Sequence, residues 1–208
     1  MIDHLLYATP DLQASVDDLN RRFGVRLSPG GRHFDLGTRN FLADLGDRTY
    51  LEVLGPDLDQ PKPAGERPLG IDRLTRPRLA TWAARVEDLD ETVRTATAHG
   101  HTYDPIVEMA RDREDGVRLE WRVAVPADGQ AFGGIVPFLI QWDSDPYAAE
   151  LSTKIVRLVS FRLFHPQATA VRQHLAVLGL ADSVAVRQAT EPSLLAVLRT
   201  PAGEVELS

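Results

Sequence analysis

The sequence predicts an α+β fold built from repeated βαβββ units, and three observations lead to this prediction. The first is an internal repeat: "HLLYATPDLQASV" aligns with "TWAARVEDLDETV" at a constant offset of 77 residues, so that His4 falls on Thr81. The second is that each copy contains one stretch of helical periodicity followed by short segments typical of strands. The third is a fainter copy of the same pattern near the C-terminus.

The first unit is expected to span residues 1–57. It begins with the apolar strand "IDHLLYA", and a helix follows whose apolar residues repeat at helical spacing on one face. Asp11 is a suitable N-cap for this helix, and Gly24 is suited to end it in the left-handed conformation. The segments "VRLSPGG", "NFLADLG" and "TYLEVLG" are then predicted as strands.

A proline-rich linker at 58–77 is expected to be extended rather than helical, and it leads to a second unit at 78–145. There the helix runs from about Asp88 to His99 and Gly100 ends it, and "VRLEWRVAVP" and "VPFLIQWD" are predicted strands. The third unit, at 155–207, has the strand "IVRLVSFRLF", a helix with Val171, Leu175 and Leu178 on one face, and three short strands, "SVAVRQA", "LLAVLRT" and "GEVELS".

A single βαβββ unit covers only one face of its sheet with a helix. We therefore expect the first two units to pair edge to edge in a curved mixed sheet that forms an open cup, because pairing removes the second apolar face from water. Side chains of the first and last strands of each unit would line the cup. The third unit would either cap it or pair with its counterpart in a homodimer.

The composition excludes several classes of function. A formal net charge of −7 gives no basic surface for nucleic acid. The absence of cysteine rules out a thiolate nucleophile and sulfur ligands for a metal. No apolar stretch is long enough to span a membrane, and no secretory signal precedes the first strand, so a cytoplasmic location is expected.

The strands that would line the cup carry a histidine and an acid. His4 lies on the first strand of the first unit, and Glu52 lies between apolar neighbours on its last strand. A buried acid is costly unless it is paired or bound to a metal, so His4 and Glu52 are candidates to hold a divalent cation. The corresponding residues of the second unit are Thr81 and Gln141, of which only glutamine is a reasonable ligand.

Five phrases of the chain, within residues 3–143, give it a specific likeness: "DHLLYATPDL", "GGRHFDLGTRN", "YLEVLGPD", "DGVRLEWRVA" and "PFLIQWD". The chain resembles the vicinal oxygen chelate superfamily, which includes glyoxalase I, bleomycin-resistance proteins and extradiol dioxygenases, and within it the glyoxalase-like domain family. The resemblance implies metal ligation by His4, Glu52 and Gln141, with Zn, Ni, Mn or Fe as the divalent ion. Thr81 departs from the ligand pattern, and superfamily members without metal bind small organic molecules in the same cup.

The phrase "GGRHFDLGTRN" is expected to line the pocket, with a turn at Gly30 and Gly31. His33 is a candidate acid or base because its ordinary pKa is near neutrality. The substrate-binding candidates are His33, Thr38, Asn40, Thr81, Arg113, Trp121, Arg122 and Gln141. The remaining histidines, His99, His101, His165 and His174, are expected to pack or to lie at the surface.

Two functions follow from these residues. In the first, a divalent ion polarises a small organic substrate while Glu52 or His33 moves a proton, as in a lyase or isomerase. In the second, the protein binds a small molecule without metal and acts as a sequestering or resistance-type protein. The replacement of a ligand by Thr81 favours the second function, and the pair His4 and Glu52 favours the first.

Overall fold

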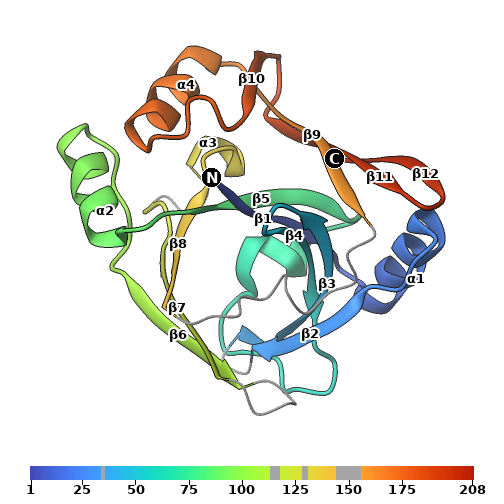
Figure 1. The fold of residues 1–208 in the computed structure, drawn as a ribbon. Coiled ribbons are helices and arrows are strands. Elements are labelled where there is room, and N and C mark those ends of the chain that lie inside the picture. Colours follow the sequence, from blue (N-terminus) through green and yellow to red (C-terminus); the bar gives the residue numbers. More distant parts are fainter. Residues whose placement is uncertain (34–35, 113–117, 128–130, 144–155) are drawn as a thin grey trace. The chain divides into compact units, whose positions relative to one another are not determined.

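The computed structural model describes residues 1–33, 36–112, 118–127, 131–143 and 156–208. The first repeat forms a strand, a helix and three strands along the chain: β1 (Ile2–Ala8), α1 (Leu12–Phe23), β2 (Ser28–His33), β3 (Thr38–Gly46) and β4 (Thr49–Pro56) (Figure 1). The linker that follows contains a short 3₁₀ segment, η2 (Pro68–Arg73), and is therefore not extended throughout as the proline content suggested.

The second repeat follows the same order with one addition. It consists of β5 (Arg78–Arg85), α2 (Leu89–Ala98), β6 (Val107–Asp112), β7 (Arg118–Ala124), the short helical segment α3 (Ala131–Gly134) and β8 (Phe138–Trp142). Strand β6 falls in a stretch that the sequence reading assigned to a long loop. Apolar and polar residues do not alternate along this segment, so no local pattern marks it as a strand. It becomes a strand by pairing along β7, from Val107↔Val123 to Asp112↔Arg118.

The third repeat also has the predicted order, with β9 (Arg157–His165), α4 (Ala168–Val177), β10 (Ala185–Gln188), β11 (Ser193–Thr200) and β12 (Gly203–Leu207). The three residues predicted on the buried face of its helix, Val171, Leu175 and Leu178, are all buried. The α+β class and the repeated βαβββ order are thus confirmed.

Strand pairing distinguishes the third repeat from the first two. The hydrogen-bonded order is β2-β3-β4-β1-β5-β8-β7-β6 in one sheet and β10-β9-β11-β12 in the other. In the first repeat the first strand, β1, lies beside the last strand, β4. In the third repeat β9 instead pairs in parallel with β10, the strand that follows helix α4 in the chain. The sequence pattern of the third repeat predicted its elements but not which of its strands are neighbours.

The chain divides into two compact units that do not follow the repeat boundaries. The first compact unit comprises Met1–His4, Thr81–Tyr147 and Phe161–Leu195, and the second comprises Leu5–Ala80, Ala148–Ser160 and Ala196–Ser208. The first is built around Trp82, which is fully buried and donates a hydrogen bond from Nε1 to the carbonyl of Ile135 at 2.8 Å. In the second, the buried face of α1 includes the fully buried Phe23.

The predicted Asp11 cap forms, and Asp88 caps α2 in the same way. Asp11 accepts a hydrogen bond from the Ala14 amide at 3.0 Å, and Asp88 accepts one from the Glu91 amide at 2.8 Å. Each cap satisfies a backbone N–H that the helix itself cannot pair. Gly24 then ends α1 with a φ of 69°, a conformation that costs glycine little and other residues more.

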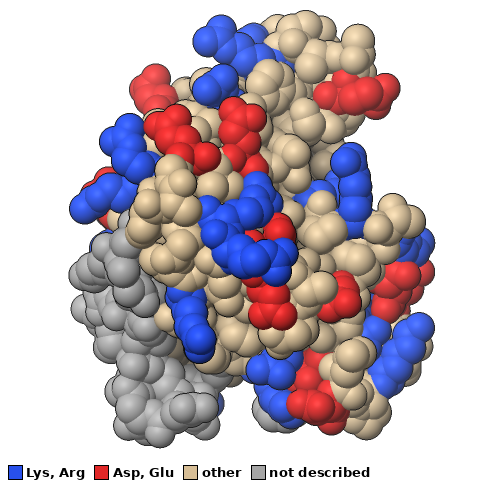
Figure 2. Space-filling view, turned by 90° about the vertical axis from the view of Figure 1, so that its right-hand side faces the viewer, with Lys and Arg blue, Asp and Glu red and all other residues tan. Residues whose placement is uncertain are grey.

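Charged side chains of both signs are interspersed on the face shown in Figure 2. Exposed ion pairs such as Arg94–Glu91 and Arg199–Glu204 place opposite charges side by side. In the part of the chain that the structure describes, none of the helices has the length and apolar character needed to cross a membrane.

Candidate functional site

Glu52 lies within a hydrogen-bonded group on strands β2, β3 and β4 of the second compact unit. Its side chain is buried, with a relative exposure of 9%, and its Oε1 accepts a hydrogen bond from Asn40 Nδ2 at 2.6 Å. The cross-strand partners of Asn40 and Glu52 are Leu54 and Leu42, so the polar pair lies among apolar side chains. Burial of a carboxylate in such surroundings requires hydrogen bonds, and the amide of Asn40 supplies one.

A β-bulge in β2 holds Asn40 in place. Between the pairs Pro29↔Phe41 and Arg32↔Arg39, two glycines of β2, Gly30 and Gly31, face the single residue Asn40 of β3. The Gly31 amide donates to Asn40 Oδ1 at 2.7 Å. A Cβ on Gly30 would lie 2.0 Å from the same oxygen, so only glycine leaves room for the Asn40 amide. The two glycines, expected to form a turn, instead form a bulge that orients Asn40.

His33 and Thr38 extend this group toward the ends of β2 and β3. They are cross-strand partners, and His33 Nδ1 lies 3.0 Å from Thr38 Oγ1. Thr38 is fully buried, whereas His33 is half-buried. Four of the predicted site residues, His33, Thr38, Asn40 and Glu52, thus occur on three adjacent strands of one compact unit. We refer to these four residues as the Glu52 group.

His4 belongs to a different cluster, in the first compact unit. Its Nδ1 donates to Asp3 Oδ1 at 2.7 Å, and the same carboxylate accepts from Arg85 Nε at 2.8 Å and from Trp142 Nε1 at 3.0 Å. Burial by itself would raise the pKa of Asp3, but the hydrogen bond from His4 and the charge of Arg85 outweigh it and lower the pKa. Because the ionised carboxylate can only accept, Asp3 fixes the tautomer and the ring orientation of His4.

Gln141 and Arg122 are held at the start of helix α2. Gln141 Oε1 accepts from the Leu89 amide and from Arg122 Nη2, both at 2.9 Å. Arg122 also donates to Asp90 of α2 at 2.8 Å. The amide oxygen of Gln141 thus satisfies a backbone N–H of the helix, which is a structural role.

The other substrate-binding candidates are placed separately. Trp121 and Trp142 are cross-strand partners whose rings lie 5.4 Å apart. Thr81 is buried on β5, with a relative exposure of 6%. Arg113 falls outside the described residues.

Each of the three predicted metal ligands has a hydrogen-bond partner in the structure: His4 with Asp3, Glu52 with Asn40, and Gln141 with the Leu89 amide. Among the described residues, no three His, Cys, Asp or Glu side chains come together as a metal-binding group. The side-chain oxygen of Gln141 already accepts two hydrogen bonds. Metal ligation by His4, Glu52 and Gln141 therefore stays a prediction, and no reaction step is assigned to a metal.

Comparison with known protein families identifies the family of the chain. The model of a glyoxalase-like domain family matches residues 2–179. The chain belongs to this family. The match includes the bulge at Gly30 and Gly31, the first two sequence repeats and helix α4 of the third. It confirms the likeness seen in the five phrases of the sequence.

One of the solved structures that match this glyoxalase-like chain shares its fold. A hypothetical protein from Staphylococcus aureus is 12% identical and has a TM-score of 0.68, over 92% of this chain and 87% of that chain. Methylmalonyl-CoA epimerase from Mycobacterium tuberculosis is 22% identical, with a TM-score of 0.46 over 70% of this chain and 88% of that chain.

A variant of the Streptomyces coelicolor methylmalonyl-CoA epimerase, in complex with 2-nitronate-propionyl-CoA, is 18% identical, with a TM-score of 0.49 over 69% of this chain and 97% of that chain. The similarity to the two epimerases carries no functional argument at these TM-scores. None of the curated proteins compared with the glyoxalase-like chain matches it.

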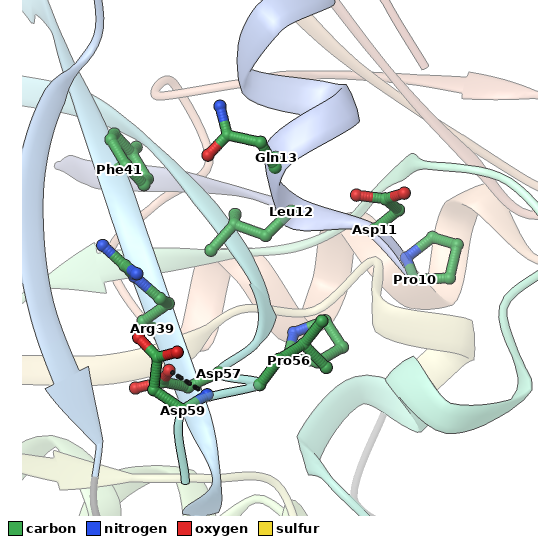
Figure 3. Close-up of a pocket in the computed structure, with 10 residues that line it drawn as sticks. Pro10, Asp11, Leu12, Gln13, Arg39, Phe41, Pro56, Asp57 and Asp59 are labelled. Atoms are coloured by element: carbon green, nitrogen blue, oxygen red, sulfur yellow. Dashed lines mark hydrogen bonds between the residues drawn. The ribbon is translucent and has the colours of Figure 1, made fainter.

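A pocket of about 250 Å³ lies beside the N-terminus of α1 (Figure 3). Leu12 and Phe41 line it together with Arg39, whose guanidinium lies 5.5 Å from the centre of the Phe41 ring. Arg39 and Phe41 alternate with Thr38 and Asn40 along β3, so this pocket lies on the opposite face of the strand from the Glu52 group. Sequence reasoning did not find it, because no motif marks it.

The charged groups that line this pocket of the glyoxalase-like chain are already engaged. Asp11 caps α1, and Asp57 accepts from Gln60 Nε2 at 2.6 Å. Asp59 pairs with Arg32 at 2.7 Å. The pocket is therefore less suited to chemistry than the Glu52 group, and we assign it no ligand.

Proposed function

We propose that this glyoxalase-like protein binds a small organic molecule at the Glu52 group and moves a proton on it, as an isomerase-type enzyme does. The observation that carries the proposal is the buried Glu52 carboxylate, held by an amide that a glycine bulge orients. Burying a carboxylate on a strand among leucines costs stability, and the structure devotes a bulge of two glycines to orienting its partner. A buried carboxylate that is oriented at a cost in stability is typical of a residue that binds or reacts with a substrate.

The residues of the group suggest how the proton transfer would proceed. Glu52, with one oxygen fixed by Asn40, would accept a proton from a carbon next to a carbonyl group of the substrate. The resulting negative charge on the substrate oxygen needs a donor. His33, half-buried beside Thr38 farther along the same three strands, is the candidate donor for a substrate large enough to reach both residues. Return of a proton from Glu52 to the same face of the carbon gives only exchange with solvent, and delivery of a proton to the opposite face would complete the isomerisation.

Deuterium exchange tests this proposal directly. The protein would be incubated in D₂O with a panel of small compounds that have an acidic C–H beside a carbonyl, and loss of the C–H signal would be followed by proton NMR. We expect exchange of at least one compound, and a loss of at least about 100-fold in the rate for Glu52→Gln. The glutamine keeps an oxygen that can accept from Asn40, so the shape of the site is preserved.

Glu87→Gln is the matched control, because Glu87 lies in the turn before α2 and is not part of the group. It should leave the exchange rate within about a factor of two of the unsubstituted protein. If Glu52→Gln and Glu87→Gln exchange the substrate equally fast, Glu52 is not the base.

A second candidate function is binding or sequestration of a small molecule without chemistry. It is favoured by Asn40 and Glu52, which together offer a fixed acceptor for a ligand hydroxyl or amine. The same panel distinguishes it: a compound that raises the melting temperature without exchanging its C–H supports binding alone. Repeating both measurements after chelation, and then after addition of divalent metal, tests the metal requirement. Light scattering tests the expected homodimer.

A further inference from the structure

Three histidines of the first compact unit gather where the segment after α2 meets α4. The imidazole rings of His101 and His174 are stacked, with centroids 3.5 Å apart and an angle of 15° between the ring planes. Phe132 of α3 contacts His174 edge to face at 6.2 Å and His165 at 5.2 Å. His101 comes from the second sequence repeat and His174 from the third, so the stack joins two repeats.

His174 is enclosed and incompletely hydrogen-bonded. Its relative exposure is 4%, and its Nδ1 is buried with no hydrogen-bond partner among the described residues. Its Nε2 lies 3.4 Å from the hydroxyl of Tyr103. In the protonated form both ring nitrogens carry a proton, so Nδ1 would become a buried donor on a charged ring with nothing in the described part of the chain to accept its hydrogen bond.

The groups around the stack offer no compensation for a positive charge. His165 Nδ1 accepts a hydrogen bond from the Gln167 amide, and exposed His99 contacts the carbonyl of Thr95. The charged side chains of the two packed helices pair elsewhere: Arg94 with Glu91, Asp90 with Arg122, and Arg172 with the Val186 carbonyl. No carboxylate of the described residues is among the groups that influence His101 or His174.

The backbone conformation of Phe132 is a further sign that the packing of its ring against His165 and His174 stabilises this region. Phe132 has a φ of 54°, in the left-handed region, which is unfavourable for a residue other than glycine. The conformation places its ring against both His165 and His174. The packing of aromatic rings at the histidines therefore offsets local strain.

We propose that His101 and His174 form an acid-sensitive latch that fastens helix α4 to the segment after α2 and releases it when the histidines are protonated. The inference is independent of the proposed function, because the latch residues are not part of the Glu52 group. Two imidazolium rings at stacking distance would repel each other, and neither has a carboxylate partner among the described residues. Release would expose the imidazoles to water, where they bind protons readily.

The sign of the pH effect follows from the pKa of His174. Burial, and secondarily His101, lower this pKa from 6.5 to about 4, and burial also lowers the pKa of His101. A histidine whose pKa is lower in the folded state stabilises that state fully above pH 6.5, and this stability is lost as the pH falls from 6.5 toward 4. At about pH 5, the opening equilibrium of α4 should be about 30-fold larger than at about pH 7.5 from His174 alone.

Hydrogen exchange of the α4 amides measures this opening. We expect exchange of the Val171 and Leu175 amides, after correction for the intrinsic rate, to be at least about 30-fold faster at about pH 5 than at about pH 7.5. His174→Phe keeps an aromatic ring and cannot be protonated, so its acid response should fall below about 5-fold. His99→Gln, which changes an exposed histidine, should respond to acid as the unsubstituted protein does.

An equal acid response in His174→Phe and in the unsubstituted protein, or no response in either, would overturn the latch. Should His174→Phe fail to fold, NMR of the imidazole signals of the unsubstituted protein decides instead. We expect the ring of His174 to stay neutral down to about pH 5. A midpoint of its titration between about pH 6 and 7, the range of an ordinary histidine, would overturn the proposal.

Discussion

At the scale of single residues, the geometry of the Glu52 group depends on the glycine at position 30, which has no side chain. Gly30 is required because the Asn40 amide occupies the space where a Cβ would be, and Asn40 in turn orients Glu52. A residue without a side chain thus determines where the carboxylate points.

Gly30→Ala tests this chain of contacts. The new methyl group would lie 2.0 Å from Asn40 Oδ1, so the amide must move and the hydrogen bonds to Gly31 and Glu52 must break. We expect a loss of about 1–3 kcal/mol in the free energy of unfolding, measured with urea. Gly65→Ala is the control, because a Cβ on Gly65 meets no atom within 4 Å and should change stability by less than about 0.5 kcal/mol. Equal effects of the two substitutions would contradict the proposed role of Gly30.

Asp3 is the second residue whose contacts determine a local structure. It is fully buried, and its carboxylate accepts hydrogen bonds from three side chains. Asp3→Asn should cost about 3 kcal/mol, because the charge of Arg85 would lose its ionised partner in a largely buried setting. Asp18→Asn, at an exposed ion pair with Arg21, should cost less than about 1 kcal/mol in the same urea measurement. A small effect at Asp3 would indicate that Arg85 is compensated elsewhere.

At the scale of elements, the two repeated helices begin in the same way. An aspartate caps the first turn in each case, and the dihedral angles of the two caps agree closely: φ −132°, ψ 100° at Asp11 and φ −130°, ψ 102° at Asp88. The sequence repeat therefore reflects a repeated local structure. The helices end differently, since α1 ends at a left-handed glycine and α2 at His99.

Asp11→Ala and Asp88→Ala should have similar effects, because each removes one side-chain acceptor from a backbone N–H of the first turn. We expect a loss of about 1 kcal/mol for each in thermal or urea unfolding. Asp17→Ala, which changes an exposed acid inside α1, should cost less than about 0.5 kcal/mol. A cost at Asp17 as large as that at Asp11 would mean that the cap contributes no more than a surface contact.

At the scale of the whole molecule, the third repeat is part of both compact units. In the second unit the Ala202 amide bonds to the Phe23 carbonyl, and Arg22 donates to the carbonyl of Glu206. In the first unit Phe161 packs edge to face on the buried Trp82. A chain that ends before β9 therefore loses part of the core of each unit.

Truncation after residue 147 should remove the cooperative urea transition of the full chain or shift its midpoint strongly downward. The physical reason is that Trp82, which is fully buried, would lose Phe161 and expose aromatic surface to water. Circular dichroism across a urea series measures this. A truncated chain that unfolds with the midpoint of the full chain would show that the third repeat is an independent attachment.

The sequence by itself determined the local structure and the family. Periodicity predicted α1, α2 and α4, aspartate and glycine marked the helix caps, and the phrases around His4, Gly30 and Glu52 identified the glyoxalase-like domain. These signals are local, because a cap or an amphipathic face depends on residues a few positions apart.

Only the tertiary structure decided which residues meet. It placed Asn40 opposite the glycine bulge, directed Gln141 to the first turn of α2, and stacked His101 on His174 across two repeats. It also gave the third repeat a strand order different from that of the first. Such contacts join residues far apart in the chain, and their free energy comes from packing and desolvation that no local pattern encodes.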